Sequence, residues 1–191
     1  MPLCYNVAAA RRQAPWAGRP RLPLALNEVF IGHRSHQSAR YRLRVGQRQE
    51  RQSSSGVICS TGTGCTGWAR SIRDQRCLPE PLPSPDQRQL AWFVREPFPS
   101  VYTATGLDHG LLDKDGGLIV DSEMGEGGVV FADVIESDRL EFLDGHRVRV
   151  TVAQTTLNLV VPGRQKAAAQ ARAVVKDKGK ERGAGKREHH A

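Results

Sequence analysis

Residues 53–71 read SSSGVICSTGTGCTGWARS, and this stretch decides how the rest of the chain is organised. A short apolar run, Val57–Cys59, enters a turn of small residues, and a pattern typical of a helix start begins at Trp68. Glycine has no Cβ, so the backbone can approach another molecule closely there. The N–H groups at a helix start favour anionic or hydrogen-bonding groups. The stretch therefore predicts a strand, a glycine turn and a helix that together bind a ligand.

Two common phosphate-binding motifs do not fit this turn. Gly62, Gly64 and Gly67 match the spacing G-x-G-x-x-G, but that motif needs a βαβ unit and an acid about 20 residues onward. The segment 78–85, LPEPLPSP, follows instead, and its prolines cannot form a second parallel strand. No lysine follows the glycines as a P-loop requires. A Rossmann domain and a P-loop are both excluded.

Length and composition indicate one domain with tails. The chain has 191 residues, of which 39% are hydrophobic, enough for a core. No run approaches the roughly 20 apolar residues of a membrane span, so we expect no membrane association. The N-terminus lacks the apolar segment of a secretory signal. Its arginines and its lack of acids are also compatible with a transit peptide, and an aberrant gene start is an equal alternative. The cysteines form no C-x-x-C pair, which favours a reduced, cytoplasmic setting without zinc.

The positive charge is concentrated at the C-terminus. The formal net charge is +8, and residues 163–191 hold nine Lys or Arg against three acids. The remaining body is close to neutral. Basic tails are usually solvating extensions, so the distribution makes nucleic acid an unlikely partner.

Short alternating segments dominate the pattern after residue 22. Val148, Val150 and Val152 alternate with polar residues, as on a strand with one wet face. Strands are expected at 24–31, 41–45, 57–59, 90–95, 117–121, 128–132, 139–143, 147–152 and 157–161, with a turn at 153–154. Many short strands and one short helix after the glycine turn predict a mainly β fold, a β-sandwich. We expect it to span 23–162, between an irregular arm over 1–22 and a basic tail, partly helical or disordered, over 163–191.

Two linked segments resemble NAD kinases. Residues 60–68, STGTGCTGW, resemble the Ser-Thr-Pro-Thr-Gly-Ser-Thr-Ala-Tyr motif of that family. Upstream, residues 24–31, LALNEVFI, resemble its Asn-Glu segment, in the same order and at similar spacing. The resemblance extends over about 24–161, and it implies the β-sandwich architecture of the family's C-terminal domain.

The resemblance assigns binding roles to individual residues. Asn27 and Glu28 fall where the family holds the ribose and the nicotinamide-side groups of the dinucleotide. The adenosine half is contacted at the positions of Thr66, Gly67, Trp68 and Ser71, and the glycine turn itself comprises Thr61, Gly62, Thr63 and Gly64. The plainer alternatives are a polar strand edge for Asn27 and Glu28, and core packing for Trp68.

Two further features depart from the family's pattern. Asp133 matches an aspartate of a late Asp-Gly, but Val134 replaces the glycine. The catalytic aspartate of the family lies in a Gly-Gly-Asp-Gly motif of an N-terminal domain, and nothing similar precedes Leu24. We therefore expect the dinucleotide-binding half of a kinase, inactive alone, with no catalytic residue or metal site of its own.

The implied reaction moves the γ-phosphoryl group of ATP to the adenosine 2′-hydroxyl of NAD, giving NADP. Mg²⁺ would arrive with ATP, and no tightly bound cofactor is expected. The intact protein is expected to be a homo-oligomer. Two alternatives stay open: a non-catalytic module for nucleotide binding or oligomerisation, and a lipid-kinase-like relative of the same superfamily.

Overall fold

The fold is known from a computed structural model, which describes residues 2–13, 24–133 and 135–160. The chain divides into two compact units. One joins Met1–Leu3 and Asn158–Ala191, and its described residues are strand ends. The other, Cys4–Leu157, holds both sheets and the candidate site. The basic tail expected over 163–191 lies outside the described residues.

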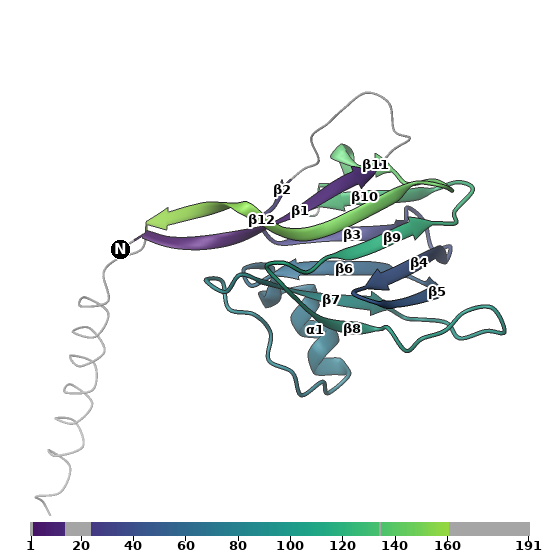
Figure 1. Ribbon diagram of the computed structural model, residues 1–191, viewed down its shortest axis with the longest axis horizontal. Helices are drawn as coiled ribbons and strands as arrows, with labels where there is room; N and C mark the ends of the chain where they lie inside the picture. Colours follow the sequence, from purple (N-terminus) through teal and green to yellow (C-terminus); the bar gives the residue numbers. More distant parts are fainter. Residues whose placement is uncertain (1, 14–23, 134, 161–191) are drawn as a thin grey trace, which may run out of the picture. The chain divides into compact units, whose positions relative to one another are not determined.

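Two six-stranded sheets make up the described fold (Figure 1). The first sheet has the order β2-β1-β12-β9-β4-β5, from Leu24–Ala25, Pro2–Gln13, Arg147–Val160, Leu118–Ser122, Ala39–Val45 and Arg48–Ser54. The second has the order β11-β10-β3-β6-β7-β8, from Leu140–Glu141, Gly128–Ala132, Glu28–His33, Gly56–Thr61, Gln89–Arg95 and His109–Asp113. Neighbouring strands of the second sheet are antiparallel throughout.

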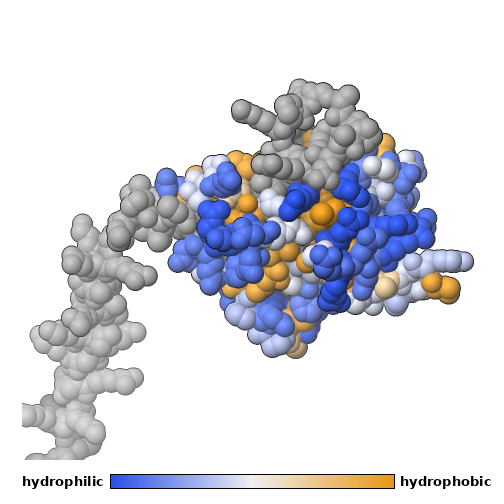
Figure 2. Space-filling model, in the orientation of Figure 1, coloured by the Kyte–Doolittle hydropathy of each residue, from blue (hydrophilic) through white to orange (hydrophobic). Residues whose placement is uncertain are grey.

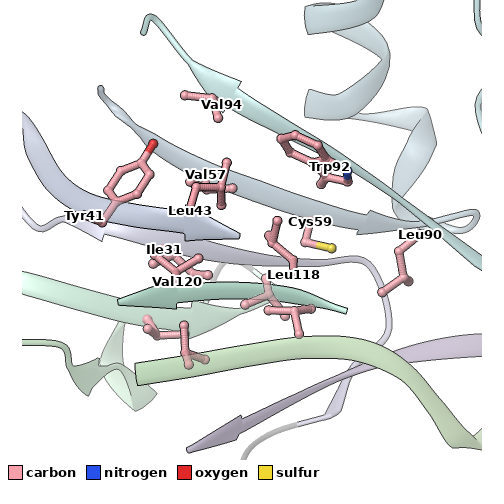
Figure 3. Close-up of a cluster of buried hydrophobic side chains, with 14 of the residues drawn as sticks. Ile31, Tyr41, Leu43, Val57, Cys59, Leu90, Trp92, Val94, Leu118 and Val120 are labelled. Atoms are coloured by element: carbon pink, nitrogen blue, oxygen red, sulfur yellow. The ribbon is translucent and has the colours of Figure 1, made fainter. Parts of the chain in front are cut away.

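The main core lies where the inward side chains of the two sheets meet. In β4, Tyr41 and Leu43 are fully buried, while Arg40 and Arg42, which alternate with them, face solvent. This two-residue alternation places every second side chain of a strand on the core face. Figure 3 shows the resulting cluster, which contains Ile31, Tyr41, Leu43, Val57, Cys59, Leu90, Trp92, Val94, Leu118 and Val120.

The central strands of the second sheet are covered on both faces. All six residues of β6 are buried, and so are five consecutive residues of β7. Their outward side chains pack under the helix α1 (Trp68–Gln75), where Ala91 and Phe93 contact Ala69 and Cys65. A strand with two buried faces is apolar at every position, which explains the continuous runs at 57–59 and 90–94.

The predicted fold class is confirmed: the protein is mainly β, and α1 follows the glycine turn directly. The strand β10 coincides with its expected bounds. Two short 3₁₀ turns, η1 (Gly64–Thr66) and η2 (Glu136–Asp138), complete the described elements.

Several local expectations were wrong. Residues 2–13 form the strand β1 where an irregular arm was expected, because no proline falls within 3–13 and the backbone is free to pair. The expected turn at 153–154 is absent, and β12 runs through it, since Ala153-Gln154 lacks residues that favour a turn. The strand β8 and the polar strand β5 were not foreseen, because neither shows a clear apolar alternation.

Candidate functional site

Thr61 joins the glycine turn to the Asn27-Glu28 segment. It ends β6, and its backbone N–H donates to the carbonyl of Asn27 at 2.8 Å. Its hydroxyl donates to the carbonyl of Leu26 at 2.5 Å and accepts from the N–H of Gly64 at 3.2 Å. Two segments that are more than 30 residues apart in sequence are thereby held in contact.

Two of the glycines approach the protein's own backbone. A Cβ at Gly64 would collide with the carbonyl of Asn27, and a Cβ at Gly62 would collide with the carbonyl of Ser84. A Cβ at Gly67 would find its nearest atom at 3.8 Å. The sequence predicted that a ligand would lie close to the glycines. At Gly62 and Gly64, however, the closely packed group is another part of the protein's own backbone. Gly67 alone of the three is exposed.

Asp133 fixes the backbone of the same segment. Its carboxylate accepts the N–H of Leu26 at 2.8 Å, of Asn27 at 2.6 Å and of Glu28 at 3.3 Å. In return its N–H donates to the carbonyl of Glu28 at 3.0 Å. Asp133 adopts φ of 52°, a left-handed conformation that aspartate tolerates better than most residues. The sequence marked Asp133 only as a family match and did not indicate this bonding.

Glu28 is half-buried beside other acidic groups. Burial raises the pKa of its carboxyl above the ordinary value of 4.5, and the charge of Asp133 raises it further. Burial also raises the pKa of the Cys65 thiol. A hydrogen bond from Ser60 lowers this pKa, and the charge of Glu28 raises it. Neither Asn27 nor Glu28 makes a side-chain hydrogen bond with any residue of the described ranges. Their polar groups are available to a ligand.

An aromatic group continues the same face of the second sheet. The ring of Trp68 is 44% exposed and lies 6.2 Å from the ring of Phe30, which stacks on Phe131 at 4.9 Å. The guanidinium of Arg95 lies 4.9 Å above the Trp68 ring. Simple core packing therefore does not describe Trp68. The sequence could not show that Phe131 and Arg95 lie near Phe30 and Trp68, because this proximity depends on which strands pair and in what register.

A hollow of about 330 Å³ opens beside these rings. Its lining combines Phe30, Phe131, Trp68 and Val129 with Arg34, Arg95, Arg139, His33 and Glu136. Glu28, Phe30 and Gly32 are successive outward positions of β3, about 7 Å apart. The carboxylate of Glu28 and the ring of Phe30 thus follow one another along β3, and Arg34 comes directly after the strand. Such an order suits a ligand with hydroxyl groups, a flat ring and phosphates.

The remaining predicted site residues lie on the rim of the turn. Thr66, Gly67, Trp68 and Ser71 are all exposed, and Ser71 lies one helical turn after Gly67, to whose carbonyl its N–H donates at 3.1 Å. Thr63 has a buried hydroxyl oxygen without a partner among the described residues. The structure joins the Asn27-Glu28 segment to the glycine turn that precedes these residues, and the binding roles of all of them stay a prediction.

Within the described ranges, no cluster of three or more His, Cys, Asp or Glu side chains could hold a metal ion. In the same ranges, no helix has the length and apolar character to cross a membrane.

Solved structures with a similar fold include two NAD(H) kinases. Yeast NADH kinase in complex with NADH aligns with a TM-score of 0.64 at 15% identity, over 85% of this chain and 45% of the yeast chain. An NAD kinase from Archaeoglobus fulgidus in complex with ATP aligns with a TM-score of 0.58 at 20% identity, over 82% of this chain and 53% of the archaeal chain. The chain shares its fold with about half of each kinase.

No family model matches the chain, and no curated protein matches it significantly. At 15–20% identity the likeness establishes the fold, and it leaves the activity to be argued from the site.

Proposed function

We propose that this chain is the dinucleotide-binding part of an NAD kinase. The supporting observation is the junction at Thr61 and Asp133, which holds the Asn27-Glu28 segment against the glycine turn. Both side chains of that segment are left without partners among the described residues, and the half-exposed ring of Trp68 follows the turn. The structural neighbours bind NADH and ATP, which agrees with a nucleotide ligand.

In this proposal the polar pair binds sugar hydroxyls. The carboxylate of Glu28 accepts protons from two vicinal hydroxyls, and the amide of Asn27 both donates and accepts. The ring of Trp68 packs against the base of the adenosine half, with Thr66, Gly67 and Ser71 along its edge. The arginines that line the hollow are assigned to the diphosphate, whose paired oxygens suit guanidinium groups.

The chemical step needs more than this binding surface. Transfer of a phosphoryl group from ATP to the 2′-hydroxyl of NAD depends on positioning and on Mg²⁺, which enters bound to ATP and neutralises charge. We assign no catalytic residue within the described ranges, because Asp133 already accepts three backbone N–H groups there. The chain by itself binds NAD and turns it over poorly, and the working enzyme is a cytoplasmic homo-oligomer.

Calorimetric titration with NAD tests the binding role. Asn27→Ala combined with Glu28→Ala should weaken binding by about 2 kcal/mol, since two polar groups that meet the ligand are lost. The melting temperature should change little, because neither side chain bonds to a described residue. The matched control replaces Gln89 and Asp113 with alanine. Their exposed side chains hydrogen-bond to each other at 2.7 Å, and neither residue belongs to the candidate site. Unchanged NAD affinity with a large loss of stability would make the pair structural.

A further inference from the structure

The outer face of the first sheet is rich in arginine. The outward positions of β4, β5 and β12 alternate with the buried core positions. They carry six arginines, which we call the arginine face: Arg40, Arg42, Arg44, Arg51, Arg147 and Arg149. Figure 2 shows the hydrophilic side chains gathered over β4, β5 and β9. Although the body of the chain is nearly neutral, this face alone carries six arginines.

Two carboxylates, Glu123 and Asp121, form ion pairs with four of these arginines. Glu123 accepts from the Nε of Arg42 at 2.9 Å and from the Nε of Arg51 at 2.5 Å. Its side chain is only 18% exposed, whereas the two arginines are 53% and 50% exposed. Both use Nε for the ion pair, and their terminal nitrogens make no hydrogen bond with the described residues. The terminal nitrogens of Arg42 and of Arg51 are therefore two pairs of free hydrogen-bond donors, on the neighbouring strands β4 and β5.

The second carboxylate, Asp121, pairs with Arg147 through two hydrogen bonds and lies 3.7 Å from Arg44. Arg149 packs over Gly117, and its buried Nε has no partner among the described residues. With six arginines against these two acids, the face keeps a surplus of positive charge that its own carboxylates do not neutralise.

Exposed aromatic rings border this face. The loop after β7 presents Phe98 and Tyr102, which are 64% and 77% exposed. The loop is attached to the edge of β5, because the N–H of Phe98 donates to Ser53 at 2.8 Å and the N–H of Ala104 donates to Arg51 at 3.0 Å. Packing in the core does not explain why two large aromatic rings are exposed to solvent beside a row of arginines.

We propose that the arginine face binds single-stranded nucleic acid. Guanidinium groups with free terminal nitrogens match the paired oxygens of a phosphodiester, and the adjoining rings stack on unpaired bases. An open sheet face with neighbouring aromatic residues suits a single strand, whose bases are accessible, better than a duplex. This surface is separate from the dinucleotide site, which lies on the second sheet.

The test is fluorescence anisotropy of the full chain with a labelled oligothymidylate over a range of salt concentrations. Arg42→Gln with Arg51→Gln should lower the salt slope by about 1.4, because each phosphate contact on a single strand contributes about 0.7, and should weaken binding about tenfold at 0.1 M salt. Arg70→Gln with Arg73→Gln removes the same charge from α1 and should leave the slope unchanged. The basic tail is present in every variant and contributes equally to each.

Further variants separate folding, charge and stacking. Arg42→Lys with Arg51→Lys keeps the charge beside Glu123, so it should keep the slope while losing part of the affinity. Phe98→Ala with Tyr102→Ala should weaken oligothymidylate binding without changing the slope. If the protein with Arg42→Gln and Arg51→Gln does not fold, the variant with Arg40→Gln and Arg44→Gln replaces it in the test.

Equal salt slopes in the β-sheet and α1 variants would overturn the proposal. Stronger binding to duplex DNA, or binding to anionic phospholipid vesicles in place of the oligonucleotide, would overturn it as well.

Discussion

Two neighbouring carboxylates of the candidate site have opposite relations to the fold. Asp133 accepts three backbone N–H groups and holds the strand start in place. Glu28 has no hydrogen-bond partner for its side chain among the described residues, and burial raises its pKa. A charged group that is desolvated and unpaired costs stability. Glu28 is therefore better explained by a ligand than by the folded state.

We expect Glu28→Gln to stabilise the protein at neutral pH. The pKa of Glu28 is raised in the folded state, so the native protein loses stability as the pH rises from about 4.5 through the folded pKa. Glutamine lacks this ionisation, and the gain should be small, about 1–3 °C in melting temperature, because the carboxyl is only half-buried. The advantage of the variant should vanish near pH 4. A variant that is less stable at pH 7 would contradict the argument.

Asp133→Ala should lower the free energy of unfolding by about 3 kcal/mol. It leaves three N–H groups without their acceptor and places alanine at φ of 52°. Asp133→Asn should cost less, about 1–2 kcal/mol, since asparagine tolerates that conformation and keeps one oxygen. Urea denaturation measures both. Equal losses for the two variants would show that the hydrogen bonds contribute little.

Part of the site was predictable from residues alone. The proximity of Asn27 and Glu28 to the glycine turn followed from two motifs. The aromatic partners of Trp68 did not, because Phe30 meets Phe131 through the pairing of β3 with β10, strands about 100 residues apart in sequence. A pattern of alternation predicts strands without stating which strands are neighbours.

At the scale of elements, the glycine turn depends on space more than on conformational freedom. None of its glycines has a positive φ, and two of them pack against carbonyl groups of other segments. The turn can therefore hold the start of α1 at a fixed place over the second sheet. The sequence predicted the strand, turn and helix correctly and misjudged what the glycines approach.

Gly64→Ala should be far more damaging than Gly67→Ala. The added Cβ at Gly64 meets the Asn27 carbonyl and should cost about 3 kcal/mol or more, since backbone atoms must shift. At Gly67 the nearest atom is 3.8 Å away, so no backbone atom has to shift to make room and the loss should be smaller than at Gly64. Thermal unfolding of the two variants side by side gives the comparison. A tolerated Gly64→Ala would mean that the two segments are not in close contact.

Other elements show why boundaries were harder to predict than fold class. The apolar runs at 57–59 and 90–94 predicted the strands β6 and β7 correctly. In β12, by contrast, valines give way to threonine and glutamine midway, and the sequence offered no reason for pairing to continue. Long-range pairing partners, absent from a local pattern, decide such cases.

At the scale of the molecule, the two sheets carry different chemistry. The outer face of the second sheet presents carboxylates, rings and a helix start, whereas the outer face of the first presents arginines. Both follow from the same two-residue alternation, which gives every strand that the helix does not cover an outward row outside the main core. Function in this protein is therefore expected on the outward rows.

The last prediction is that the purified chain binds NAD but forms NADP very slowly with ATP and Mg²⁺. A general base near the accepting hydroxyl typically contributes 10²–10⁴-fold, and correct placement of the phosphates contributes separately. Asp133 is bonded to the backbone, and Glu28 is assigned to sugar hydroxyls, so neither is free to act as that base. We expect turnover at least about a thousandfold below that of a complete NAD kinase.

The assay follows NADP formation beside such a kinase, with NAD binding measured on the same preparation. Binding without turnover agrees with the proposal, and the absence of both would reject the dinucleotide role. Robust turnover that Glu28→Gln abolishes would place the catalytic base at Glu28 and reassign the whole site from binding to catalysis. Phosphorylation of a lipid acceptor in place of NAD would instead assign the chain to the lipid-kinase-like relatives.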